Sequence, residues 1–366
     1  MHSVLVSGAY GFFGRRICQA LAAEPRIRLL VAGRDPGKAQ ALAAALGLPA
    51  AQALALDARA ATLAQQFTQA GVHTVIHTAG PFQGQDYAVA RAAMAAGAHY
   101  IDLADGRDFV AGIAQLDAAA RARGVLVCSG ASSLPALSSA VVDHLLPRFG
   151  RLDAIAHGIS SGARSPGLAT LRGIFGYGGK PFERWVDGRW QSTFGWLDLQ
   201  AYRFPPPVGL RLLGSCDVPD VALFAARYPG VKSVRFHAGF ASAPGHLVVW
   251  LLAQLVRLGL LRSMAGFAPA LHALSEVLQP LVSDKGGMYV SLRGEDPAGA
   301  PLQLVWHLVA THNHGPQIPC GAAIALARKL ACGGPLEPGA RPCMGLLTLH
   351  EYLAELASFD VWEIAP

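Results

Sequence analysis

Three glycines near the start of the chain have the spacing of a phosphate-binding turn. The first glycine of such a turn permits a tight bend, the second lets the backbone approach a pyrophosphate, and the third allows close packing of helix on strand. An apolar run, residues 3–7, leads into this turn, and a helical pattern follows it, so free N–H groups would face the phosphates. We therefore predict dinucleotide binding by residues Gly8, Tyr10, Gly11, Phe12, Phe13 and Gly14.

The end of the second apolar run favours one dinucleotide over the other. Sites for NAD place Asp or Glu about 20 residues after the glycines, where this chain has Gly33 and Arg34. An arginine can bind the 2′-phosphate of NADP through paired hydrogen bonds, for a preference of roughly ten- to a hundredfold. We therefore predict NADP, with Asp35 turned back to the ribose as the alternative. Asp57, after the third run, is assigned to the adenine edge or to a helix N-cap.

Small residues follow the fourth run and a hydroxyl follows the sixth. Ala79 and Gly80 keep side chains away from the path of pyrophosphate and ribose, and Pro81 fixes a turn. An ordinary strand-to-helix loop is the alternative. Ser129 could meet the nicotinamide ribose or amide, although turn formation explains it equally well. Both segments are assigned to the carboxyl edge of a parallel sheet, where ligands bind.

Hydride transfer also needs a group that gives or takes a proton. Asp102 and Tyr100 belong to the fifth run, at the same predicted edge; a capping aspartate and a packed aromatic are the alternatives. His312 and His314 would share one face if they lay on a strand, which suits proton transfer. Together with His307 they could instead be loop histidines, and we predict no metal because no Cys or carboxylate completes a set nearby.

The elements that must position these groups alternate strand and helix. Six short apolar or β-branched runs between residues 3 and 129 are separated by alanine-rich helical stretches, including 109–123. Right-handed crossovers then give a doubly wound parallel sheet of the Rossmann type with strand order 3-2-1-4-5-6. We assign residues 1–131 to this domain.

Residues 132–366 depart from that rhythm and are assigned to a second, α+β domain. The stretch 287–310 alternates around a turn and predicts an antiparallel hairpin, and helices are expected at 321–331 and 349–357. An open sheet edge would allow a homodimer. Residues 316–366 could instead pack back on the first domain. The fold class is thus α/β with a second domain built on a mainly antiparallel sheet.

Composition narrows the function further. The 366 residues carry 30 Lys and Arg against 24 Asp and Glu, with no basic block, which argues against nucleic-acid binding. Six scattered cysteines without a CxxC pair, and no secretory leader, indicate a reducing cytoplasm. The longest apolar run, 247–261, contains Gln254 and Arg257 and is too short to span a membrane; a core or surface helix, or one in peripheral membrane contact, is expected.

The motifs taken together resemble the saccharopine dehydrogenase family in its NADP-binding domain. The matching segments are GAYGFFG at 8–14, AGR at 32–34, AGPFQG at 79–84 and AHYIDLAD at 98–105. The resemblance implies that the glycines, Arg34 and residues 79–81 line NADP and that Asp102 lies near its nicotinamide end. The second half lacks the polar, arginine-rich set expected for saccharopine or lysine, and is similar to the saccharopine dehydrogenase-like oxidoreductases.

The predicted function follows from these assignments. We expect an NADP-dependent oxidoreductase acting on a small, largely apolar carbonyl, imine or alkene. Six tryptophans and the apolar run 247–261 favour an apolar substrate. Two alternatives stay open: a non-catalytic NADP-binding protein with a role in assembly or membrane contact, and an amino-acid dehydrogenase. The latter needs a cation for the substrate carboxylate, for which the sequence offers Arg107, Arg164, Arg172 and Lys180.

Overall fold

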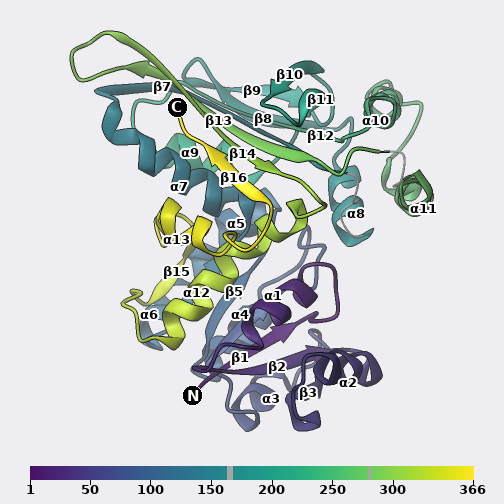
Figure 1. Cartoon of the computed structure of the whole chain (residues 1–366), viewed down its shortest axis with the longest axis vertical. Coiled ribbons are helices and arrows are strands. Elements are labelled where there is room, and N and C mark those ends of the chain that lie inside the picture. Colours follow the sequence, from purple (N-terminus) through teal and green to yellow (C-terminus); the bar gives the residue numbers. More distant parts are fainter. Residues whose placement is uncertain (163–167, 279–281) are drawn as a thin grey trace. The chain divides into compact units, whose positions relative to one another are not determined.

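A computed structural model describes residues 1–162, 168–278 and 282–366 (Figure 1). Arg164 therefore lies outside the described residues. The chain divides into two compact units. Unit 1 comprises Met1–Leu137 and Gln317–Glu355, and unit 2 comprises Ser138–Pro316 and Leu356–Pro366.

Unit 1 is built on a parallel sheet of seven strands in the order β15-β6-β5-β4-β1-β2-β3. The predicted order 3-2-1-4-5-6 is confirmed, with β15 added beside β6. Strand β1 is central and buried from Ser3 to Ser7, as expected for a strand covered on both faces. The strands are β1 (His2–Ser7), β2 (Ile27–Gly33), β3 (Ala53–Ala55), β4 (Thr74–His77), β5 (His99–Asp102), β6 (Leu126–Ser129) and β15 (Gly339–Pro342).

Helices cover this sheet, and local sequence explains where several begin. Pro36 occupies the first turn of α2, and the Asp35 side chain accepts a hydrogen bond from the Lys38 amide as its N-cap. The stretch 109–123, predicted as one helix, is instead α5, a 3₁₀ turn at Ile113–Leu116 and α6. The helices are α1 (Gly14–Leu21), α2 (Pro36–Ala45), α3 (Leu63–Gln69), α4 (Ala88–Ala95), α5 (Arg107–Gly112), α6 (Asp117–Ala122), α12 (Gly321–Ala331) and α13 (Leu349–Ala354).

The late segment 317–355 is an integral part of unit 1. Its strand β15 pairs in parallel with β6, and α12 packs against α1, as the yellow-green and purple ribbons show (Figure 1). Arg328 of α12 joins the segment to the region after α1, because its guanidinium donates to the carbonyl of Ala20 at 3.1 Å and lies 3.5 Å from a Glu24 oxygen. Within the segment it also donates to the carboxylate of Glu355. Helix α12 is buried along Gly321–Ala327, which explains its run of small residues.

Unit 2 contains a mixed, mostly antiparallel sheet in the order β10-β11-β12-β7-β13-β14-β16. Among its described strands, β12 and β7 pair in parallel and the others are antiparallel. The predicted hairpin is confirmed as β13 and β14, paired from Gly286–Ala310 to Glu295–Pro301. Strands β8 and β9 form a separate pair. The strands are β7 (Arg151–Ser160), β8 (Pro181–Val186), β9 (Arg189–Phe194), β10 (Gln200–Phe204), β11 (Gly209–Ser215), β12 (Ser233–Gly239), β13 (Gly286–Glu295), β14 (Pro301–Ala310) and β16 (Val361–Ile364).

Five α-helices are described in unit 2: α7 (Ser138–Leu145), α8 (Leu168–Gly176), α9 (Pro219–Arg227), α10 (Ala243–Arg257) and α11 (Ala268–Leu278). Helix α10 contains much of the apolar run and lies on the surface. No helix in the described part of the chain is long and apolar enough to cross a membrane.

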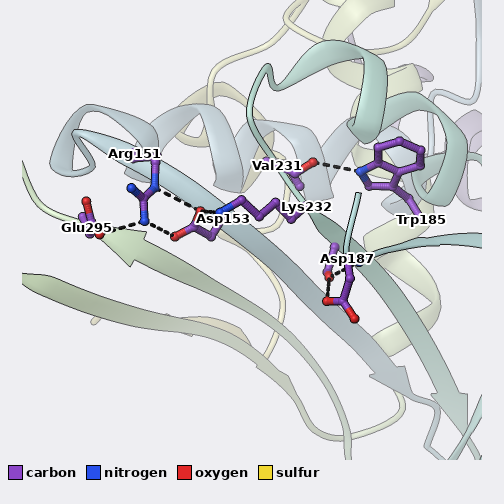
Figure 2. A network of polar contacts seen from close by, with 8 residues as sticks. Arg151, Asp153, Trp185, Asp187, Val231, Lys232 and Glu295 are labelled. Carbon is purple, nitrogen blue, oxygen red and sulfur yellow. Dashed lines mark hydrogen bonds and ion pairs between the residues drawn. The ribbon is translucent and has the colours of Figure 1, made fainter. Parts of the chain in front are cut away.

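Ion pairs at one end of β7 tie three segments of unit 2 together (Figure 2). Arg151 contacts Asp153 at 3.1 Å and Glu295 of β13 at 2.7 Å, while Lys232 lies 3.3 Å from Asp153. Close by, the Trp185 indole donates to the carbonyl of Val231 at 2.8 Å. These ion pairs thus connect β7 to β13 and to the residue that precedes β12.

Candidate functional site

The glycine turn between β1 and α1 leaves no room for larger residues at two positions. Gly8 has a φ of +79°, a conformation that strains any residue with a Cβ. A Cβ on Gly14 would lie 2.3 Å from the carbonyl oxygen of Gly8, and the Gly11 amide donates to that same oxygen at 2.9 Å. Phe13, at the N-cap of α1, supplies no side-chain hydrogen bond to the first turn. The turn therefore brings backbone, and no capping side chain, to the helix N-terminus.

Tyr10 links this turn to the end of β2. Its hydroxyl accepts a hydrogen bond from the Asp35 amide at 2.9 Å, and its ring occupies the space that a Cβ on Gly33 would need. Arg34, between these two residues, is exposed. Asp35 is engaged in capping α2, and its carboxylate lies 3.7 Å from Lys38. The Asp35 charge is thus paired with Lys38, whereas the Arg34 guanidinium is exposed at the strand end.

The loop after β4 is held by side chains that sequence reasoning missed. The Thr78 hydroxyl donates to the carbonyl of Ser7 at 2.9 Å, which fastens the loop to β1. The Gln85 amide donates to the carbonyls of Ala79 and Pro81 at 3.0 and 2.6 Å, on either side of Gly80. A hydroxyl directly after a strand was the available signal for Thr78, whereas nothing local singled out Gln85.

Asp102 is the polar centre of the neighbouring loops. It is fully buried, and its Oδ1 accepts hydrogen bonds at 2.9 Å from the Ala104 amide, the Ser129 hydroxyl and the Gly130 amide. Burial raises the pKa of this carboxyl to about 6, although the hydrogen bonds oppose the shift. The structure thus brings together Asp102 and Ser129 and gives the carboxylate a bracing role between the ends of β5 and β6.

Tyr100 is also buried, with 1% of its surface exposed. Burial raises the pKa of its phenol well above the usual value, and the nearby Asp102 carboxylate adds a smaller effect in the same direction. Asp57 accepts a hydrogen bond from the amide of Arg59 at 3.0 Å, as in an aspartate turn, and is exposed. Tyr100 is therefore packed within unit 1, while Asp57 stabilises the turn after β3.

The three histidines in and just after the hairpin occupy different settings in unit 2. His307 lies on β14 and its ring pairs with the Tyr202 hydroxyl at 2.9 Å. The expectation that His312 and His314 share a strand face is wrong, because β14 ends at Ala310 and His312 has a φ of +53°. Both rings instead approach the Asp360 carboxylate, at 3.1 and 3.2 Å. Among the described residues, no group of three or more potential ligands is arranged to hold a metal.

A second polar cluster, buried in unit 2, has no sequence signal. Ser138 of α7 donates to the carboxyl group of Asp220 on α9, and His157 of β7 lies 3.8 Å from the same oxygen. All three side chains are fully buried. Burial lowers the pKa of His157 to about 3 and raises that of Asp220 to about 7, so neutral forms are favoured. The three residues of this cluster lie on separate elements that only the folded structure brings together.

Comparison with known families identifies the first domain. Residues 4–128 match the model of the saccharopine dehydrogenase NADP-binding domain, and they contain the glycine turn, Arg34 and Asp102. This segment is therefore similar to saccharopine dehydrogenase NADP-binding domains. The resemblance inferred from the motifs is thereby confirmed. A search of curated proteins finds no match.

Solved structures extend the likeness of this saccharopine dehydrogenase-like chain to its full length. Apo saccharopine dehydrogenase (L-Glu forming) from Saccharomyces cerevisiae is 14% identical, with a TM-score of 0.70 over 100% of both chains. Amine dehydrogenase from Mycobacterium smegmatis is 12% identical, with a TM-score of 0.51 over 96% of this chain and 95% of the other. These values establish a shared fold.

Proposed function

We propose that this protein is an NADP-dependent oxidoreductase. The observation that carries the proposal is the pairing of the Gly8–Gly14 turn with the exposed Arg34 at the end of β2. The turn offers backbone to a pyrophosphate, and the guanidinium offers paired donors to a 2′-phosphate. Because Asp35 is engaged by the Lys38 amide and ammonium, its competing role at the ribose is disfavoured.

The residues present fit a nicotinamide dinucleotide. A Cβ at Gly14 would collide with the Gly8 carbonyl, so the close packing of the start of α1 on the turn depends on glycine. Gly8, Tyr10, Gly11, Phe12, Phe13, Gly14, Gly33, Arg34, Ala79, Gly80, Pro81 and Ser129 are proposed to surround the cofactor. When bound, the nicotinamide supplies the hydride that the reaction transfers.

Asp102 is proposed as a positioning residue. By accepting three hydrogen bonds on one oxygen, it fixes Ser129 and the backbone of residues 104 and 130 at the strand ends. Thr78 and Gln85 fix the 79–81 loop through side-chain hydrogen bonds to the carbonyls of Ser7 and Ala79. The chain's own residues thus order the edge where the cofactor would bind, before any ligand arrives.

The substrate is proposed to be a small, largely apolar carbonyl, imine or alkene. Trp196 and Trp306 are core residues, with 2% and 1% exposed, so the tryptophan argument loses two members. The support that remains comes from the other four tryptophans, of which Trp190 and Trp362 are 45% and 41% exposed. We further propose a reducing, cytoplasmic setting for the six free cysteines, and a homodimer through the edge strand β10.

A nucleotide titration tests the cofactor proposal. Wild type, Arg34→Ala and Arg91→Ala are titrated with NADPH and NADH, following nicotinamide fluorescence; Arg91 is an exposed arginine of α4 and serves as the matched control. We expect wild type and Arg91→Ala to bind NADPH at least about tenfold more tightly than NADH. Arg34→Ala should lose roughly ten- to a hundredfold in affinity for NADPH and little for NADH.

Two results would contradict parts of this proposal separately. Equal affinities in wild type would remove the 2′-phosphate argument, and no binding of either nucleotide would reduce the glycine motif to a structural turn. Activity is then assayed as NADPH oxidation with carbonyls, imines and conjugated alkenes. Tight NADPH binding without turnover of any of these would favour a non-catalytic NADP-binding role.

A further inference from the structure

Helix α10 of unit 2 presents an apolar face to the outside. Leu247, Val248 and Leu251 are 44%, 46% and 54% exposed, whereas His246, Val249 and Ala253 on the other face are buried. The exposed positions recur at helical spacing, so they form one stripe along the helix. A surface helix normally shows the reverse arrangement, with polar side chains facing water.

The stripe continues beyond the end of the helix. Leu258 and Leu260 are 68% and 73% exposed, and Leu274 and Val277 of α11 are exposed as well. Helices α10 and α11 lie towards the same end of unit 2 in Figure 1. We call the exposed set of residues 247, 248, 251, 258 and 260 the α10 face. Exposed apolar side chains concentrated in this way mark an interaction surface.

The charges within the segment that forms the α10 face have one sign. Residues 243–262 contain no acidic residue, and their cations are Arg257 and Arg262, both exposed at the end of the stripe. Arg257 also extends over the ring of Phe194, with its guanidinium carbon 4.5 Å from the centroid. The surface therefore combines exposed apolar side chains with two arginines at one end. A second copy would bring the same segment, which has no acid to pair with these arginines.

We propose that the α10 face docks on an anionic lipid surface, with the helix lying in the plane of the interface. Leucine and valine side chains would enter the boundary between headgroups and acyl chains, and the two arginines would meet anionic headgroups. None of the helices described could span the bilayer, so the contact is peripheral. This inference does not depend on the nucleotide proposal.

Vesicle co-sedimentation of the full-length protein tests the proposal. The vesicles are phosphatidylcholine alone and a mixture of phosphatidylcholine with phosphatidylglycerol. Wild type is expected to bind the anionic vesicles more tightly, and Leu251→Glu to lower the partition coefficient by about tenfold or more. Arg262→Gln should lower it about fivefold on anionic vesicles and leave phosphatidylcholine unaffected.

A matched control lies on β16, the edge strand of the unit 2 sheet at the other end from β10. Ile364 of β16 is 36% exposed, so Ile364→Glu adds the same charge to another apolar surface position and should bind vesicles like wild type. Val248→Ser provides a milder second variant should Leu251→Glu melt at a lower temperature. The proposal is overturned if wild type does not bind anionic vesicles, or if Ile364→Glu weakens binding as much as Leu251→Glu. A dimer in sedimentation velocity that Leu251→Glu dissociates, without vesicle binding, would assign the face to a second copy.

Discussion

Two buried titratable side chains, one in each unit, have different hydrogen-bond surroundings. In unit 1, one oxygen of Asp102 accepts three hydrogen bonds, two of them from backbone amides. In unit 2, His157 is equally buried, yet neither ring nitrogen has a hydrogen-bond partner among the described residues, and its neighbours include the rings of Phe224 and Phe236. A buried group with partners contributes to stability, whereas one without partners costs its full desolvation.

Because of this difference, we expect Asp102 to act mainly as a structural hydrogen-bond acceptor and His157 to make stability depend on pH. The Asp102 donors stabilise its charged form against burial, and its pKa moves only to about 6. His157 has no such support, and burial lowers its pKa to about 3. We therefore expect the removal of Asp102 to destabilise the protein, and the removal of His157 to change mainly its response to acid.

The largest effect is expected for Asp102→Leu. This change leaves the Ser129 hydroxyl and the amides of Ala104 and Gly130 without their acceptor inside the protein, at a cost of about 3–5 kcal/mol in the free energy of unfolding. Urea denaturation measures it. Asp108→Leu, at an exposed position of α5, is the control and should stay near wild type. An unchanged midpoint in Asp102→Leu would show that the three donors find other acceptors.

The next effect concerns pH. The folded pKa of His157 lies below the unfolded value of 6.5, so the unfolded chain binds the proton first and stability is lost as pH falls from about 6.5 towards 3. For this residue alone the loss between pH 7 and pH 5 is roughly 2 kcal/mol. His157→Leu should unfold like wild type at pH 7 and be less sensitive to acid. Parallel stability curves at the two pH values for both proteins would refute this assignment.

Arg328→Ala tests whether the 317–355 segment is held to the rest of unit 1 by side-chain bonds as well as by packing. The guanidinium is 38% exposed, so solvent screens its ion pairs and the expected loss is about 1–2 kcal/mol. Thermal unfolding monitored by circular dichroism measures it. Arg123→Ala, at an exposed position after α6, is the comparison and should not shift the transition.

The smallest effect is expected at the surface of unit 2. Arg151 is exposed and its ion pairs with Asp153 and Glu295 are screened by water and salt (Figure 2). Arg151→Ala should leave the melting temperature within experimental scatter, most clearly at high ionic strength. A large drop in the melting temperature would mean that the network fixes the register of β7 against β13. Exposed polar groups of unit 2 would then contribute to its stability as buried ones do.

The features that could be predicted are those encoded within a few residues. The glycine spacing of residues 8–14, the alternation that orders the six strands and the hairpin 287–310 all appear in the structure. Strand β15 could not be foreseen, because its four residues gain their strand character from pairing with β6, more than 200 positions earlier. The single helix expected at 109–123 is wrong, since a 3₁₀ turn at Ile113–Leu116 separates the two short helices α5 and α6.

By itself, the sequence determined the parallel sheet, the phosphate-type turn and the arginine at the end of β2, because each follows from local conformational preference and hydrophobic period. The tertiary structure alone decided that Asp102 braces two loops, that Gln85 holds the 79–81 carbonyls and that His157 is buried beside Asp220. These contacts join residues distant in the chain, and their energies depend on burial and on the direction of each hydrogen bond. Neither quantity exists until the chain has folded.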